Sequence, residues 1–126
     1  MTILLVDDNP PSRELMRDLL EASGHLIMEA VNGREALDLI RLYQPDLVFL
    51  DLQMPVLDGF SVIRELRNDV DFHSMAVVAV TASAMLGDRE RAIAAGFDSY
   101  IAKPIELSEV ENQVELLSSR QSRLGK

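Results

Sequence analysis

The chain has 126 residues, the usual length of a single domain with one core. Its formal net charge of −9 argues against general binding of nucleic acid, which requires a basic surface. The absence of cysteine excludes disulfides and thiolate metal sites. No apolar run approaches the roughly 20 residues of a membrane-spanning helix, and the N-terminus lacks a signal-peptide pattern. We therefore expect a soluble, cytoplasmic domain that contacts neither a membrane nor nucleic acid directly.

Short apolar runs alternate five times with segments of helical pattern. The runs are too short for core helices and have the composition of buried strands. We predict strands at residues 2–6, 25–30, 47–50, 75–80 and 100–101. The repeated alternation of such strands with helices indicates a parallel sheet that is covered on both faces.

The first predicted helix begins and ends at typical capping residues. Asn9 is expected to cap it, Pro10 lies in its first turn, and Gly24 ends it. Its apolar stripe is expected to consist of Leu15, Leu19 and Leu20.

The later helices are predicted from similar patterns. Asn32 and Glu35 resemble a capping box, and the helix they open should run to about Tyr43. Asp58 and Gly59 form a turn before the third helix, whose inward residues should be Phe60, Ile63 and Leu66. The fourth helix is expected at about residues 86–95, before Gly96, and the last should bury Leu107, Val110, Val114 and Leu117.

These elements predict the flavodoxin-like (βα)5 fold, a doubly wound parallel sheet of the α/β class with strand order 2-1-3-4-5. Right-handed crossovers restrict the possible topologies, and five βα units suit that order. We expect the domain to occupy residues 1–118 and residues 119–126 to form a flexible tail.

Polar side chains follow the predicted strands at one edge of this sheet. Asp7 and Asp8 follow the first strand and Asp51 follows the third, and these two strands are neighbours in the predicted order. Thr81 and Lys103 follow the fourth and fifth strands. Ligands of open α/β sheets bind at this edge, so we expect all five residues to line one pocket.

Such a pocket is suited to binding a divalent cation and a phosphoryl group. Three clustered carboxylates repel one another unless a cation neutralises them, and Mg²⁺ suits oxygen ligands beside a phosphate. Lys103 offers a charge for a phosphoryl oxygen, and Thr81 offers a hydroxyl donor. Alone, each residue has a simpler interpretation as a cap, a turn, a strand residue or a surface charge. Together they indicate an aspartate that attacks a phosphoryl donor and forms an acyl phosphate.

The motifs at these strand ends resemble those of a known family. Over about residues 2–117 it is similar to the receiver domain of two-component response regulators, the CheY-like fold, above all to DivK-type single-domain regulators and hybrid-kinase receivers. The resemblance rests on Asp7-Asp8, on Asp51 with Met54-Pro55 and Asp58-Gly59, on Thr81-Ala82, and on Lys103-Pro104.

The resemblance implies a role for each acid. Asp51 would accept a phosphoryl group from a histidine of a partner, either a sensor histidine kinase or a histidine phosphotransfer protein. Asp8 and Asp51 would bind Mg²⁺ directly with the backbone carbonyl of Gln53, and Asp7 would act partly through water. Gln53 and Ser83 would occupy variable positions that tune dephosphorylation.

The resemblance also implies a switch. Thr81 and Lys103 would hold phosphoryl oxygens, and the Lys103-Pro104 peptide would be cis. Movement of Thr81 towards the phosphoryl group would let Tyr100 rotate inward. The surface of the fourth helix, fifth strand and fifth helix would then change, and it would signal to a downstream protein or form a phosphorylation-dependent homodimer.

Three other functions compete with a signalling receiver, which catalyses only its own phosphorylation and dephosphorylation and is no enzyme for an external substrate. A pseudo-receiver would use the fold for interaction alone, but it would not need the acidic cluster or Lys103. A Mg²⁺-dependent phosphatase would use Asp51 as nucleophile, but it usually needs an acid where this chain has Gln53. A flavin-binding domain would need a phosphate-binding loop where Asp7 and Asp8 would repel the phosphate.

Overall fold

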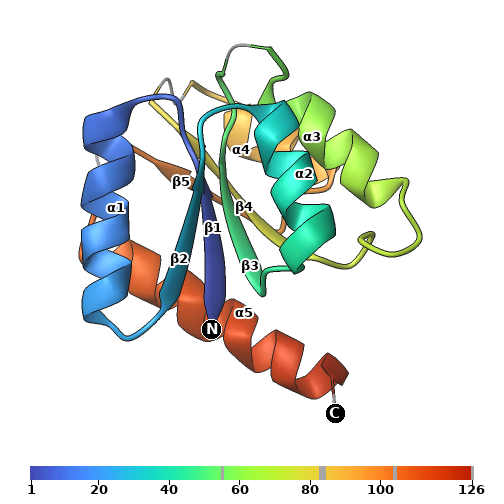
Figure 1. Cartoon of the computed structure of the whole chain (residues 1–126). Helices are drawn as coiled ribbons and strands as arrows, with labels where there is room; N and C mark the ends of the chain where they lie inside the picture. The colour runs from blue at the N-terminus through green and yellow to red at the C-terminus, as the bar shows by residue number, and fades with distance from the viewer. Residues whose placement is uncertain (55, 83–84, 104, 126) are drawn as a thin grey trace.

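The computed structural model describes residues 1–54, 56–82, 85–103 and 105–125, with side chains described up to residue 117. Within them a five-stranded parallel sheet has the order β2-β1-β3-β4-β5. Helices cover both of its faces (Figure 1). The flavodoxin-like fold and strand order predicted from the sequence are therefore confirmed.

The strands lie close to the predicted runs. Their bounds are β1 Thr2–Val6, β2 Leu26–Ala30, β3 Leu47–Asp51, β4 Ala76–Thr81 and β5 Ser99–Ala102. Strands β3 and β4 are buried along their whole length, which is why their sequences are continuous apolar runs and not alternating ones.

The helices begin where polar side chains can cap them. Their bounds are α1 Pro10–Ala22, α2 Gly33–Tyr43, α3 Gly59–Arg67, α4 Asp88–Ala95 and α5 Leu107–Gly125. The side chains of Asn9, Asn32 and Asp58 accept hydrogen bonds from backbone N–H groups in the first turns of α1, α2 and α3. The range of α5 includes residues 119–125, and the flexibility of that segment stays a prediction.

Two hydrophobic cores hold the helices on the sheet. One lies between the sheet and helices α2, α3 and α4, and the other lies between the sheet and helices α1 and α5. Along β1 the side chains alternate between them: Leu4 and Val6 enter the first core, whereas Ile3 and Leu5 enter the second. Because both faces are buried, polar groups can gather only at the ends of the strands.

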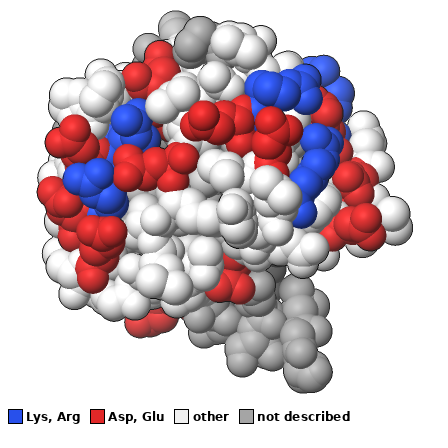
Figure 2. All heavy atoms as spheres, viewed as in Figure 1, with Lys and Arg blue, Asp and Glu red and all other residues white. Residues whose placement is uncertain are grey.

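The charged surface is mixed. On the face seen in Figure 2, acidic and basic side chains both gather over α1 on one side and over α2 and α3 on the other. Among the described residues, no helix is both long and apolar enough to cross a membrane.

Three details of the predicted helices are wrong. Leu15 is 50% exposed, and the inward stripe of α1 consists of Met16 and Leu20, which are one helical turn apart. Leu86 is fully exposed and precedes α4, which begins at Asp88. Leu107 is 43% exposed at the start of α5, whereas Val110, Val114 and Leu117 are buried as predicted.

The contrast within α1 gives a test of this packing. We expect Leu20→Ala to lower the free energy of unfolding by about 2–5 kcal/mol, because it leaves a cavity in the second core. Leu15→Ala on the same helix should change it by no more than about 0.5 kcal/mol. Urea unfolding of the two variants measures the difference, and equal losses would contradict the assigned face of α1.

Candidate functional site

The acids after β1 and at the end of β3 meet at the carboxyl ends of these neighbouring strands. Val6 is paired with Leu50, so the residues that come next, Asp7 and Asp51, lie side by side. Asp7, Asp8 and Asp51 each offer a carboxylate oxygen, and these oxygens all lie within 4.8 Å of one another. The acidic cluster expected from the sequence is therefore present in the structure.

Lys103 bridges two of these acids. Its Nζ donates to Asp7 Oδ2 at 2.8 Å and to Asp51 Oδ2 at 3.3 Å. The backbone N–H of Lys103 donates to the carbonyl of Thr81 at 2.8 Å, which joins the ends of β5 and β4. All five residues that the sequence places in the pocket thus lie at one edge of the sheet, with Thr81 buried at the end of its strand.

The two buried acids have defined positions. Asp7 Oδ1 accepts from the N–H of Asn9 at 2.8 Å, and Asp51 Oδ1 accepts from the N–H of Gln53 at 2.9 Å. Asp7 and Asp51 are each 6% exposed, whereas Asp8 is exposed. Each buried carboxylate therefore keeps one oxygen on a backbone N–H and the other on Lys103.

The arrangement shifts the pKa values of Asp51 and Lys103. Burial raises the pKa of Asp51 above the usual value of a carboxyl group, and the negative charge of Asp7 adds to this effect. The N–H of Gln53 and the charge of Lys103 act against it without cancelling it. Burial alone would lower the pKa of Lys103, but its bonds to Asp7 and Asp51 outweigh burial and hold that pKa above its usual value.

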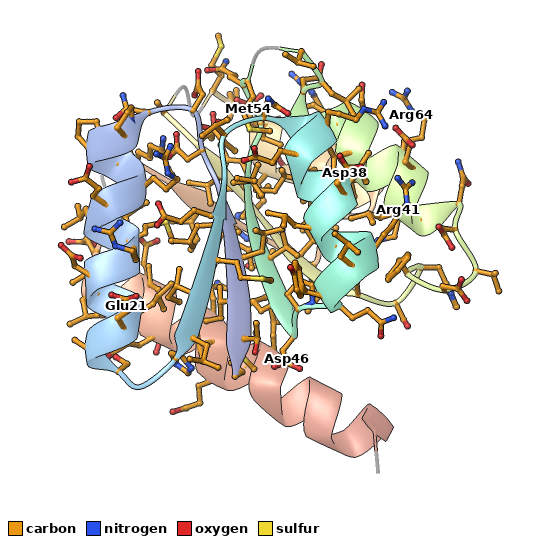
Figure 3. The ribbon with its side chains drawn as sticks, viewed as in Figure 1. Glu21, Asp38, Arg41, Asp46, Met54 and Arg64 are labelled. Atoms are coloured by element: carbon orange, nitrogen blue, oxygen red, sulfur yellow. The ribbon has the colours of Figure 1, made fainter. Side chains whose placement is uncertain are left out.

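The loop after β3 is fitted tightly against the strand end. The N–H of Gly59 donates to the carbonyl of Leu52 at 3.2 Å. A Cβ at Gly59 would lie 2.6 Å from the carbonyl oxygen of Asp51, so only glycine allows this approach. Figure 3 labels Met54 in this loop and Asp46 before β3, at the opposite edge of the sheet. Asp46 is therefore an acid of the same strand region that lies outside the cluster.

Further expectations concern the Lys103-Pro104 peptide, Ser83 and Tyr100. The predicted cis peptide between Lys103 and Pro104 and the role of Ser83 lie outside the described residues. Tyr100 has a buried ring, and its hydroxyl is buried without a hydrogen-bond partner among the described residues.

Sequence reasoning missed one residue of the site. Arg13 of α1 donates from Nη1 to the backbone carbonyl of Asp7 at 2.7 Å. The available signal is its position, one helical turn after the cap Asn9 and on the side of the acids.

Comparison with known proteins agrees with this geometry. Residues 3–115 match the family model described as "Response regulator receiver domain". The polar-differentiation response regulator DivK of Brucella anthropi is 43% identical over 106 residues, which cover 84% of this chain and 86% of that protein. Its counterpart in Brucella ovis is 42% identical over the same shares.

Solved structures give the same result. The receiver domain of a sensor histidine kinase from Pseudomonas aeruginosa is 31% identical to this chain, with a TM-score of 0.84. The match covers 93% of this chain and 97% of that one, and that structure has a magnesium ion coordinated in its active-site cleft. The signal receiver domain of a histidine kinase from Syntrophus aciditrophicus is 32% identical with a TM-score of 0.85, over 94% of this chain and 89% of its own. By the extent of the family match and the identity to DivK, the chain belongs to the family of response regulator receiver domains.

Proposed function

We propose that this chain accepts a phosphoryl group from a phosphohistidine onto Asp51 and passes the signal on by a change of surface. Receiver domains are signalling domains that work with histidine kinases and with downstream targets. The observation that carries the proposal is the contact of one ammonium with two buried acids: Lys103 Nζ lies 2.8 Å from Asp7 Oδ2 and 3.3 Å from Asp51 Oδ2.

The donor set fits Mg²⁺, which receiver domains bind in their acidic pocket. Asp7, Asp8 and Asp51 present clustered carboxylate oxygens, the ligand type that hard divalent ions prefer. In our proposal Asp8, Asp51 and the carbonyl of Gln53 hold the ion directly, and Asp7 acts partly through water. The bound ion supplies neutralising charge for the acids and for the incoming phosphoryl oxygens.

The residues of the chain then have distinct tasks. A carboxylate oxygen of Asp51 attacks phosphorus, the bond from phosphorus to the histidine nitrogen breaks, and the imidazole leaves with the bonding electrons. Lys103 moves from the carboxylates to a phosphoryl oxygen, and Thr81 donates its hydroxyl to another. Attack by water on the acyl phosphate later returns free Asp51 and phosphate.

The competing functions fit the site less well. A pseudo-receiver has no use for two buried acids bridged by a lysine, because each buried charge costs free energy. A phosphatase with Asp51 as nucleophile lacks an acid at position 53, where Gln53 offers no proton for a leaving group.

The phosphoryl transfer can be tested by intact mass. With Mg²⁺ and acetyl phosphate, we expect a gain of one phosphoryl group that requires the metal and is absent in Asp51→Asn. Asp46→Asn is the matched control, because Asp46 lies at the other edge of the sheet and should leave the gain unchanged (Figure 3). Full retention of the gain in Asp51→Asn would exclude Asp51 as the acceptor, and no gain in the wild type would favour the pseudo-receiver.

The switch that we propose centres on Tyr100. Its hydroxyl is buried and has no partner among the described residues, a situation that costs about 1–3 kcal/mol. Arg89 of α4 lies over the ring, with its guanidinium carbon 5.6 Å from the ring centre. A buried ring with this penalty is suited to exchange with an exposed position, and engagement of Thr81 by a phosphoryl group would favour the buried one. The surface of α4, β5 and α5 would change with it.

Tyrosine fluorescence measures this exchange directly. The chain has two tyrosines and no tryptophan, so in a Tyr43→Phe background the emission comes from Tyr100 alone. Tyr43 is 61% exposed, so its replacement should leave the fold intact. Although the ring is buried in the structure, the proposed exchange leaves some quenching of Tyr100 by acrylamide from molecules with the ring exposed. We expect phosphorylation to reduce that remaining quenching, and to do so less in Thr81→Ala. Identical quenching with and without the phosphoryl group would contradict the switch.

A further inference from the structure

Arg13 joins the first helix to the backbone of the acidic cluster. Its Nη1 donates to the carbonyl oxygen of Asp7 at 2.7 Å, and its Nε donates to Glu29 Oε1 at 2.8 Å. The side chain is only 15% exposed. One guanidinium therefore spans from β2 to the loop after β1, using the fixed fork that distinguishes arginine from lysine.

Glu29 holds this guanidinium in place. Its second oxygen, Oε2, accepts from Arg17 Nη1 at 3.1 Å, so the carboxylate lies between two arginines of α1. Burial would raise the pKa of Glu29, but the hydrogen bonds from Arg13 and Arg17 outweigh burial and hold that pKa below its usual value. Figure 2 shows basic side chains among acidic ones on the side of the molecule where α1 lies. The Glu29 carboxylate is therefore charged at neutral pH.

The carbonyl that Arg13 binds belongs to the peptide between Asp7 and Asp8. The other polar groups of Asp7 have partners as well, since its N–H donates to Ala30 and its carboxylate accepts from Asn9 and Lys103. The side chain of Asp8 is exposed and accepts no hydrogen bond from any described residue. The direction in which this side chain leaves the backbone depends on the two peptides that flank Asp8. The N–H of Asn9 holds the second peptide against Asp7 Oδ1, and Arg13 holds the first through the Asp7 carbonyl.

We propose that Arg13 is a positioning residue that fixes the Asp7–Asp8 peptide and so aims the Asp8 carboxylate at the cation site. The role rests on the function proposed above, because it concerns the Mg²⁺ held by the same acids. Arg13 binds the Asp7 carbonyl and Glu29, and its hydrogen bonds reach neither Asp51 nor Lys103. Partners of this outer kind typically change metal affinity by about 10–100-fold when they are removed.

Arg17 supplies a matched control. It binds the same Glu29 from the same helix but makes no hydrogen bond to the Asp7 carbonyl. Arg13→Gln and Arg17→Gln each remove one positive charge and one contact with Glu29. Loss of a positive charge near an acidic cluster favours cation binding, so electrostatics alone predicts equal or tighter Mg²⁺ binding in both variants.

The experiment is a calorimetric titration of Mg²⁺ into the wild type and both variants. We expect the Kd of Arg13→Gln to rise about 10-fold or more, and that of Arg17→Gln to stay within about twofold of the wild type. In metal-free protein, the amide resonance of Asp8 should shift in Arg13→Gln only, because that N–H shares a peptide with the Asp7 carbonyl. A purely structural role would lower the unfolding free energy of both variants without separating their Kd values.

Equal Kd values for the two glutamine variants would overturn the proposal. If Arg13→Gln does not fold, Arg13→Lys and Arg17→Lys take its place under the same criterion, because lysine keeps the charge but cannot reach both partners with a fork. Failure of the proposed metal site is distinguishable, since it would leave the wild type itself without Mg²⁺ binding and would overturn both, whereas failure of phosphoryl transfer alone would show in the intact mass and leave the Kd values to decide the role of Arg13. Wild-type binding with no separation of the variants would overturn the role of Arg13 alone.

Discussion

The candidate site is organised around one charged contact, the bridge from Lys103 to Asp7 and Asp51. Three carboxylates gather at the carboxyl ends of β1 and β3, and one ammonium faces them. Burial raises the pKa of Asp51, with a smaller contribution from the charge of Asp7, and the Gln53 N–H and Lys103 do not cancel this effect. In the proposed function a divalent cation and a phosphoryl group complete this pocket together, because the cation would offset the acids and the phosphoryl group would give Lys103 a new partner.

The fold makes this arrangement possible. Continuous apolar strands bury both faces of the sheet, so the acids directly after β1 and at the last position of β3 emerge together at its edge. Gly59 then allows the loop after β3 to pack against the carbonyl of Asp51, and the cap Asn9 fixes the start of α1 beside Asp7. The two hydrophobic cores hold the helices on both faces of the sheet behind this edge.

The sequence predicted the strand order and the clustered acids because both follow from where apolar runs end in a charged residue. It was less informative where neighbouring positions are equally apolar: Leu15 and Met16 differ by one position, and only packing decides which faces the core. The position of Arg13, one turn after the cap Asn9, indicated that it lies near the acids, but a hydrogen bond to a backbone carbonyl leaves no residue pattern that would identify Asp7 as its partner. The buried hydroxyl of Tyr100 depends on tertiary packing in the same way.

The central claim is that the buried charge of Asp51 costs stability until a cation binds. Its most direct test is the unfolding free energy of the wild type and of Asp51→Asn, measured against pH with and without Mg²⁺. Because burial raises the pKa of Asp51 in the folded state, its ionisation costs stability as pH rises above about 4, the value in unfolded chains. Without Mg²⁺ we expect Asp51→Asn to be the more stable protein at neutral pH, with the difference vanishing in acid. Saturating Mg²⁺ should then stabilise the wild type more than the variant, because Asp51 is a proposed ligand. The account would be contradicted if the wild type were more stable than Asp51→Asn at neutral pH without the metal and if Mg²⁺ did not stabilise it further.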